Sequence, residues 1–155
     1  MQEALLVLTA FVLMEFIAAL AHRVIFHGFG YGIHKSHHMP RTGVFELNDF
    51  YPLISAGITM TIIALGIWVP ELKFLIPVGF GMTAYGVAYF FIHDLMVHQR
   101  ARWLKINPSL FKWQYEAHQL HHRFSGAPYG FVFPVVPKRL RKYLSGGSEC
   151  SSQHE

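Results

Sequence analysis

The sequence predicts an all-α integral membrane protein with three to four transmembrane helices. Only 14% of its 155 residues are charged and 52% are hydrophobic, whereas a soluble domain usually has about 25% charged residues. Three long apolar runs are separated by polar stretches, and ten of the eleven histidines lie in four short motifs near the ends of these runs. Much of the surface is therefore expected to meet lipid rather than water.

Each apolar run is long enough to cross a bilayer core of about 30 Å, which takes roughly 20 helical residues. The runs are residues 4–22, interrupted only by Glu15, then residues 51–69 and residues 74–97. The first run has neither a basic start nor a small-residue cleavage site, which argues against a signal peptide. The sequence also allows a fourth, bent span built from residues around 100–120.

The remaining chain fits a single domain with a short tail. We expect residues 1–144 to form the membrane domain and residues 145–155, SGGSECSSQHE, to be a disordered tail in which His154 is incidental. Cys150 is the only cysteine, so no intrachain disulfide can form. The segment 131–137, FVFPVVP, is too short to span and contains prolines, which favours an interfacial or re-entrant piece.

The basic residues predict the orientation of the chain. Twelve of the thirteen lie between the first two spans or after the third, and only Lys73 lies in the turn between spans two and three. By the positive-inside rule, the side of the membrane that carries these twelve basic residues is cytoplasmic, so the N-terminus is expected outside and the C-terminus inside. The net charge is +4, and the basic residues lie beside the apolar spans. This placement indicates contact with a membrane surface rather than binding to nucleic acid.

Two of the histidine motifs read HxxHH. They are His34-x2-His37-His38 and His118-x2-His121-His122. Positions i, i+3 and i+4 share one face of an α-helix. Each motif can therefore aim three imidazoles into a single cavity.

The other two motifs read Hx4H, and they are His22-x4-His27 and His93-x4-His98. On a regular helix, i and i+5 diverge by about 140°. Such a pair either serves two metal centres or sits where the helix is unwound. GFGYG, which follows the first pair as residues 28–32, is well suited to breaking a helix.

Residues 39–92 contain no histidine and form a hairpin that leaves one membrane face and returns to it. All four motifs are thus expected at one surface, as a cytoplasmic histidine-rich cap able to hold two metals. A structural zinc site is normally four-coordinate, so ten histidines are too many for one ion. They suit two ions with about five nitrogen ligands each.

Two other metal chemistries fit less well. Membrane-bound b-type haem uses isolated histidine pairs on facing spans, whereas these histidines gather in triplets at span ends. A metal transporter typically places its acids and histidines near mid-membrane. A metal-binding or transport protein without redox chemistry remains the alternative from a different functional class.

With the four motifs in view, the chain resembles the β-carotene hydroxylases of the fatty-acid-hydroxylase-like membrane di-iron superfamily. The resemblance runs from about residue 10 to residue 135. It is carried in order by HRVIFHG, HKSHHMPRTGVFELND, GMTAYGVAYFFIHDLMVHQR and AHQLHHRFSGAPYGF. The short length is similar to the bacterial enzymes, whereas GAPYGF looks closer to the plant type.

This resemblance implies two non-haem irons that activate O2 and hydroxylate C3 of β-ionone rings, converting β-carotene to β-cryptoxanthin and zeaxanthin. Zinc can replace iron in recombinant protein, since imidazole sites accept both. The implied ligands are the ten histidines of the motifs, namely His22, His27, His34, His37, His38, His93, His98, His118, His121 and His122. The spacing leaves open which histidine binds which ion.

The same resemblance implies three partners: a carotenoid that arrives through the membrane, the lipid bilayer, and an electron donor such as reduced ferredoxin. The sequence has no reductase or nucleotide motif, so the electrons must come from outside the chain. Basic residues around positions 100–112 offer a docking face for this donor, although contact with lipid headgroups explains them at least as well. The cytoplasmic membrane of a bacterium is the expected location.

Three acidic residues are predicted to support the histidines, because metal-bound histidine commonly donates its second N–H to a carboxylate. Asp94 adjoins His93, and Asp49 follows the second motif. Glu15 lies seven residues before His22, near the same helical face. Tyr129 and Arg123 are better explained as interfacial anchors. Within the superfamily, ketocarotenoids, sterols and fatty acyl chains remain alternative substrates.

Overall fold

A computed structural model describes residues 1–155 except 41–42, 44, 102, 105–106 and 145–155. Three helical stretches in the described residues are long and apolar enough to cross a membrane. They are Gln2–Phe29, Leu47–Trp68 and Leu75–Val97. The shortest has 22 residues and would reach about 33 Å at 1.5 Å per residue. The three expected spans are therefore confirmed, while the expected disordered tail, 145–155, lies outside the described residues.

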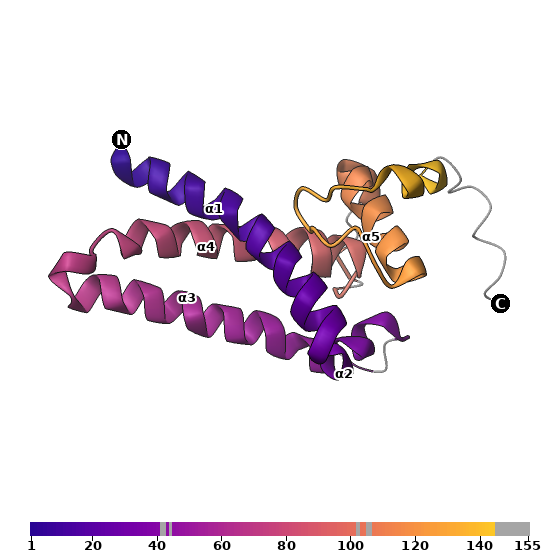
Figure 1. The fold of residues 1–155 in the computed structure, drawn as a ribbon, viewed down its shortest axis with the longest axis horizontal. Helices are drawn as coiled ribbons and strands as arrows, with labels where there is room; N and C mark the ends of the chain where they lie inside the picture. Colours follow the sequence, from indigo (N-terminus) through magenta and orange to yellow (C-terminus); the bar gives the residue numbers. More distant parts are fainter. Residues whose placement is uncertain (41–42, 44, 102, 105–106, 145–155) are drawn as a thin grey trace.

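The three spans form an uneven bundle whose histidine-bearing segments lie at one end (Figure 1). α3 (Phe50–Trp68) and α4 (Leu75–Tyr89) run antiparallel and are joined by the 3-10 turn η4 (Pro70–Leu72). α1 (Gln2–Ala21) crosses α4, with which it makes its main contacts. The expected hairpin without histidine is thus α3–α4, and its turn lies at the end away from the histidines.

Small residues let α4 approach both neighbours closely. A Cβ atom at Gly81 would collide with the carbonyl oxygen of Val7 in α1, and one at Gly79 would collide with the side chain of Ile63 in α3. Between membrane helices, such close backbone approach replaces the hydrophobic driving force that lipid removes. Glycine at these two positions therefore lets both helices pack against α4.

The first and third spans continue beyond their α-helical parts into π-helical segments. α1 runs into η1 (His22–Phe29), and α4 runs into η5 (Phe90–Val97). After η1 come the short α2 (Tyr31–His34) and the 3-10 segment η2 (Lys35–His38), and η3 (Leu47–Asp49) leads into α3. Nine of the ten motif histidines therefore lie on helical segments and His98 directly follows η5, and three of these segments are not regular α-helix.

After the third span come η6 (Pro108–Phe111), α5 (Lys112–Phe124) and η7 (Lys138–Tyr143). α5 has 13 residues, which is about 20 Å and too short for a bilayer core. The described residues around 100–120 therefore do not form a fourth span. α5 ends where Ser125 takes the left-handed conformation, a common way to terminate a helix.

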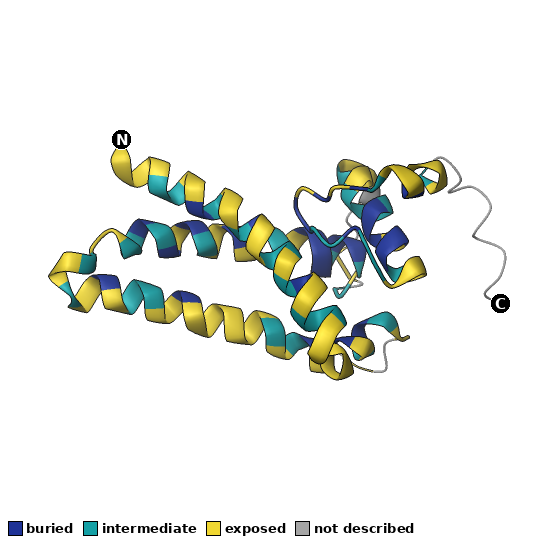
Figure 2. Ribbon diagram, in the orientation of Figure 1, coloured by how far each residue is buried: buried dark blue, intermediate teal, exposed yellow. Residues whose placement is uncertain are grey.

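Burial is concentrated at the histidine end of the molecule (Figure 2). Along α1 and α3 most side chains are exposed, and most of the exposed ones are apolar, which is the pattern of helices whose outer surface meets lipid. At the histidine end, Met96, His22, His121 and Val136 are each less than 2% exposed. The protein thus has its densest packing around the histidines rather than in the middle of the spans.

Candidate metal centre

The ten motif histidines meet at one end of the bundle, and eight of them form two groups. Within each group, one ligating atom per residue lies within 4.8 Å of all the others. Group A consists of His22, His27, His34 and His121, and group B consists of His37, His93, His98 and His118. Each group draws on segments far apart in sequence, so the centre exists only in the folded chain.

The two remaining histidines extend these groups. Nε2 of His38 lies 3.2 Å from Nε2 of His34, beside group A. Nε2 of His122 lies 2.7 Å from Nε2 of His118 in group B. With them, each group has five imidazoles, which is the number expected around each ion. That these ten nitrogens bind metal stays a prediction.

Each HxxHH triplet divides between the two groups, which corrects the expectation of three imidazoles in a single cavity. In the second motif the chain changes from α-helix to 3-10 helix after His34, so His34 belongs to group A and His37 to group B. α5 is regular through the fourth motif. Its His121 nevertheless faces group A while His118 faces group B, because i+3 is rotated about 60° from i. Both triplets thus run along the boundary between the groups.

Each Hx4H pair stays within one group, because both pairs lie on π-helical turns. The backbone N–H of His98 donates to the carbonyl of His93, 3.0 Å away, which is the i→i+5 bond of a π-helix. Gly30 makes the corresponding bond to Ile25 at 2.8 Å. Of the two options left open by the sequence, the unwound helix is therefore the one observed. π-helical turns are frequent at functional sites.

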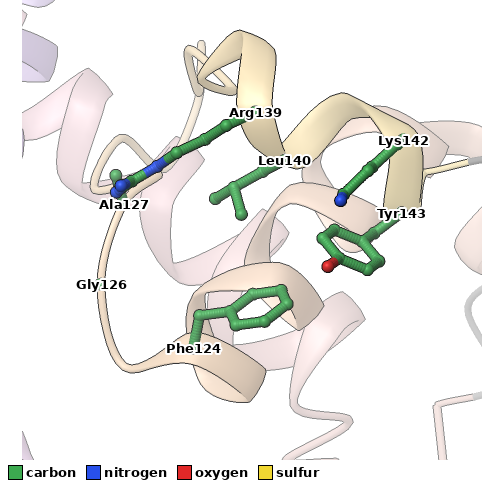
Figure 3. A pocket seen from close by; sticks show the side chains of 7 residues that line it. All are labelled: Phe124, Gly126, Ala127, Arg139, Leu140, Lys142 and Tyr143. Carbon is green, nitrogen blue, oxygen red and sulfur yellow. The ribbon is translucent and has the colours of Figure 1, made fainter.

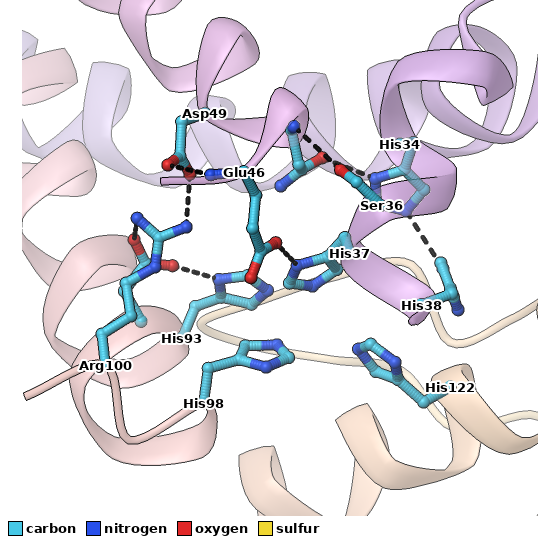
Figure 4. Close-up of polar contacts among 12 residues, drawn as sticks. His34, Ser36, His37, His38, Glu46, Asp49, His93, His98, Arg100 and His122 are labelled. Atoms are coloured by element: carbon cyan, nitrogen blue, oxygen red, sulfur yellow. Dashed lines mark hydrogen bonds and ion pairs between the residues drawn. The ribbon is translucent and has the colours of Figure 1, made fainter. Parts of the chain in front are cut away.

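The histidine rings are oriented by oxygen acceptors outside the centre. Nδ1 of His34 donates to Oδ1 of Asn48 at 2.7 Å, and Nδ1 of His93 donates to Asp94 at 2.7 Å. Nδ1 of His37 lies 3.3 Å from Glu46, as Figure 4 shows for this part of the centre. These bonds turn the Nε2 atoms inward, the arrangement typical of histidines that bind metal.

Backbone carbonyls do the same for two histidines of group A. The carbonyl of Tyr129 accepts from Nδ1 of His22 at 2.9 Å, and that of Gly126 accepts from Nδ1 of His121 at 2.6 Å. In each of these two rings the proton is on Nδ1, so Nε2 presents a lone pair.

The inward nitrogens fit a cation between them. His22 and His34 both carry their proton on Nδ1, yet their Nε2 atoms are 3.2 Å apart. Two lone pairs cannot hydrogen-bond to each other, whereas adjacent nitrogen ligands of a metal with bonds of about 2.1 Å lie about 3.0 to 3.4 Å apart, depending on the coordination geometry. Among the described residues, the buried Nε2 atoms of His37 and His93 also have no hydrogen-bond partner. These nitrogens suit two metal ions.

Burial keeps the imidazoles outside the spans neutral. It lowers the pKa of His38 to about 4 together with the neighbouring His34 and His27. Burial and adjacent imidazoles likewise lower the pKa of His37 and of His122 to about 2, and burial does so for His121. The pKa of His118 is also held well below 6.5 by burial. Because neutral imidazole is the form that binds metal, protons do not compete for these nitrogens near pH 7.

The three predicted acidic residues have different environments. Asp94 bonds to His93, as expected, and also lies 3.5 Å from Arg100. Asp49 instead forms an ion pair with Arg100 and accepts a hydrogen bond from the backbone of Glu46 at 3.0 Å. Asp49 therefore supports the centre through Arg100, which bridges it to Asp94.

Glu15 is turned away from the histidines. Its carboxyl group accepts hydrogen bonds from Tyr85 and from three consecutive backbone N–H groups of residues 131–133. Glu15 therefore does not bond to His22, although the two residues lie near the same face of the helix.

Several supporting residues were not identified from sequence. Glu46 and Asn48 lie in the FELND stretch but were not singled out. The ring of Tyr129 lies within 5.9 Å of His22, His27 and His121 by ring centroids, so this residue is more than an interfacial anchor. The carbonyl acceptors could not have been found, since a backbone oxygen has no sequence signal.

The centre opens on one side into a hollow of about 340 Å³. The hollow is lined by His37 and His98 of group B and by the two additional histidines, His38 and His122, together with Met39, Glu46 and Gln119. Elsewhere the centre is covered by aromatic rings. Tyr89 stacks on His93 with ring centroids 4.6 Å apart, and Phe131 stacks on His22 at 4.8 Å. The centre is therefore open at the hollow, whereas His93 and His22 lie under aromatic rings.

Known proteins with similar sequences agree on one family. The model for "Fatty acid hydroxylase" matches residues 7–140. A β-carotene hydroxylase of Pseudescherichia vulneris is 41% identical over 92% of this chain and 82% of its own length. One from Pantoea ananas is 42% identical over 92% of this chain and 83% of its own. The chloroplastic β-carotene 3-hydroxylase 1 of Arabidopsis thaliana is 39% identical over 88% of this chain but 44% of its own.

No solved structure gives a significant match, so the fold and the arrangement of the groups rest on this structure. The sequence matches extend across all three spans and all four histidine motifs. The chain therefore belongs to the fatty acid hydroxylase family, in which its similar relatives are β-carotene hydroxylases.

Proposed function

We propose that this protein is a β-carotene hydroxylase that adds hydroxyl groups at C3 of the β-ionone rings, giving β-cryptoxanthin and then zeaxanthin. Relatives that cover most of this chain and of their own length are named for β-carotene, and the plant relative is named for position 3. These names favour a carotenoid over the fatty acid named by the family model. Residues 1–144 would form the hydroxylase domain.

The observation that carries the metal part of the proposal is the pair of facing lone pairs on His22 and His34. We infer two non-haem irons, one held by group A with His38 and one by group B with His122. When bound, the irons would supply the activation of O2 that an inert ring C–H bond requires. A metal transporter is disfavoured, because the histidines lie at span ends rather than at mid-membrane.

The surrounding residues have separate tasks in this proposal. Asn48, Glu46 and Asp94 hold imidazole rings through Nδ1 and keep Nε2 directed at the ions. The aromatic side, with Tyr89 and Phe131, excludes water and faces the spans, from which an apolar substrate would arrive. The polar hollow gives water and protons a route between the centre and the aqueous side.

Electrons must come from a partner, and we propose an acidic carrier such as ferredoxin. Of the basic residues around 100–112, Arg100 is held by Asp49 and Asp94, and Lys112 pairs with Glu116 at 3.6 Å. Arg102 and Lys105 lie outside the described residues.

A second hollow of about 340 Å³ is a better docking face (Figure 3). Arg139 and Lys142 lie at its edge, and Gly126, which bonds to His121, forms part of its wall. Charge reversal of Arg139 and Lys142 together should slow donor-dependent turnover, and adding salt should slow the wild type in the same way.

We also propose that the protein lies in a bacterial cytoplasmic membrane with the histidine groups on the cytoplasmic side. The three apolar helices support membrane insertion. The distribution of lysine and arginine supports the orientation.

Expression in a bacterial host that makes β-carotene tests the function directly. We expect β-cryptoxanthin and zeaxanthin to accumulate and the purified protein to hold two metal ions per chain. His121→Ala should abolish both products, while His154→Ala, outside the motifs, should leave them unchanged. Fewer than two metals together with no hydroxylated product would refute the proposal. Zinc in place of iron would not, because imidazole sites bind both.

A further inference from the structure

The carboxyl group of Glu15 lies inside the first span and is 95% shielded from solvent, since the residue is 5% exposed. An ionisable group at this depth is costly unless it is fully hydrogen-bonded. Its oxygens accept from the Tyr85 hydroxyl at 2.8 Å and from the backbone N–H groups of Phe131, Val132 and Phe133 at 2.9, 3.0 and 3.0 Å. Glu15 therefore binds three consecutive backbone N–H groups in addition to one side chain.

That stretch needs such a partner. Residues 129–137 have no regular secondary structure, and irregular backbone at membrane depth is tolerated only where its polar groups are satisfied within the protein. Gly130 permits the contact, because a Cβ atom there would lie 2.5 Å from Oε1 of Glu15. The FVFPVVP segment, predicted to be interfacial or re-entrant, is thus hydrogen-bonded to the first span through the carboxyl group of Glu15.

The segment held in this way presents one ring to both histidine groups. Phe131 is 7% exposed. It stacks on His22 of group A with ring centroids 4.8 Å apart and planes 10° apart, and it meets His93 of group B edge-on at 5.3 Å. The rings of Tyr89 and Phe131 also meet edge-on, with centroids 4.8 Å apart. Phe131 therefore lies across the boundary between the groups, on the side that faces the spans.

We propose that Phe131 is the residue against which the substrate ring rests, and that Glu15 is a positioning residue that keeps it there. The inference rests on the proposed function, in which an apolar ring reaches the groups from the bilayer. A ring approaching from that side meets Phe131 first, and its position sets which carbon faces the histidines. Because His22 also bonds to Tyr129 in the same segment, Glu15 fixes one wall and one histidine together.

Amide hydrogen exchange of the purified protein tests the role of Glu15 without using activity. Glu15→Gln keeps the shape but replaces one acceptor oxygen by an N–H donor. We expect the amides of residues 131–133 to exchange at least tenfold faster in this variant, and Tyr85→Phe to have a smaller effect. Glu3→Gln, at the exposed start of the same helix, is the control. Unchanged exchange at 131–133 in Glu15→Gln would overturn the positioning role.

Kinetics test the role of Phe131. Phe131→Leu should retain two metals per chain, yet its kcat/KM for β-carotene should fall about tenfold to a hundredfold, because misplacing a substrate by about 1 Å costs that much. The products should shift toward singly hydroxylated carotenoid. Phe133→Leu is the matched control in the same segment, since that ring is 56% exposed.

Equal kinetics in wild type and Phe131→Leu, or an equal loss in Phe133→Leu, would refute the inference. A loss of metal in Phe131→Leu would also refute it, since the ring would then act on the ions rather than on the substrate. A wild-type protein that hydroxylates nothing would instead overturn the proposed function, and the exchange measurement would still decide the role of Glu15.

Discussion

At the scale of single residues, the sequence identified the histidines and Asp94, which bonds to His93, but not the other atoms that orient the rings. The i, i+3, i+4 pattern was enough to select His34 and His118, because helical periodicity is a property of the sequence itself. The acceptors for His22 and His121 are backbone carbonyls of Tyr129 and Gly126. Their positions depend on how a loop of irregular conformation folds back, and no residue type encodes that in advance.

Asn48 allows the orienting role to be measured. Asn48→Leu removes the acceptor for Nδ1 of His34 and leaves a buried N–H without a partner, so we expect metal affinity to fall about 10- to 100-fold. Asn48→Asp retains an oxygen acceptor and should restore most of the affinity. Asn107→Ala, on the exposed surface, serves as the control. Chelator competition measures all three, and wild-type affinity in Asn48→Leu would contradict the role assigned to this bond.

At the scale of elements, the spans were predictable because bilayer thickness imposes a length on apolar helices. The π-helical turns η1 and η5 were predictable only as one of two options. An i, i+5 pair conflicts with α-helical geometry, but the sequence cannot tell whether the helix deforms or the pair separates. The structure shows deformation in both places, so each Hx4H pair converges on one group.

The packing of α4 on α1 makes a prediction about two glycines in one helix. Gly81→Ala would push a methyl group into the backbone oxygen of Val7, and overpacking of this kind typically costs about 1–3 kcal/mol. Gly86→Ala meets nothing within 4 Å and should be neutral or slightly stabilising, because alanine favours helix. Thermal unfolding in detergent should separate the two variants. Equal midpoints would show that the close approach at Gly81 contributes nothing.

At the scale of the whole molecule, ten imidazoles packed together make the metal-free fold sensitive to acid. Outside the spans, the pKa of His38 is about 4 and those of His37, His121 and His122 are about 2 in the folded protein, against about 6.5 when unfolded. Between these values the unfolded chain binds more protons, so stability falls as pH decreases below about 6.5.

The melting temperature of the metal-free protein in detergent should therefore drop between pH 7.5 and pH 5. His38→Gln removes one site of proton uptake on unfolding and should make that drop smaller. A melting temperature that stays constant or rises toward pH 5 would contradict this explanation. It would show that the imidazoles are not held neutral by burial in the folded protein.

The arrangement of the whole chain in the membrane gives the last prediction, which native Cys150 makes accessible to experiment. If the N-terminus is outside, the α3–α4 turn containing Lys73 also lies outside, while the histidine groups and Cys150 lie inside. A membrane-impermeant thiol reagent applied to intact cells should then leave the wild type unlabelled and should label the Lys73→Cys, Cys150→Ser double variant. Lysed cells should label both proteins, which controls for reactivity. Labelling of Cys150 in intact cells would invert the orientation and place the histidine groups and the electron-donor surface on the outer face, where no cytoplasmic reductant could reach them.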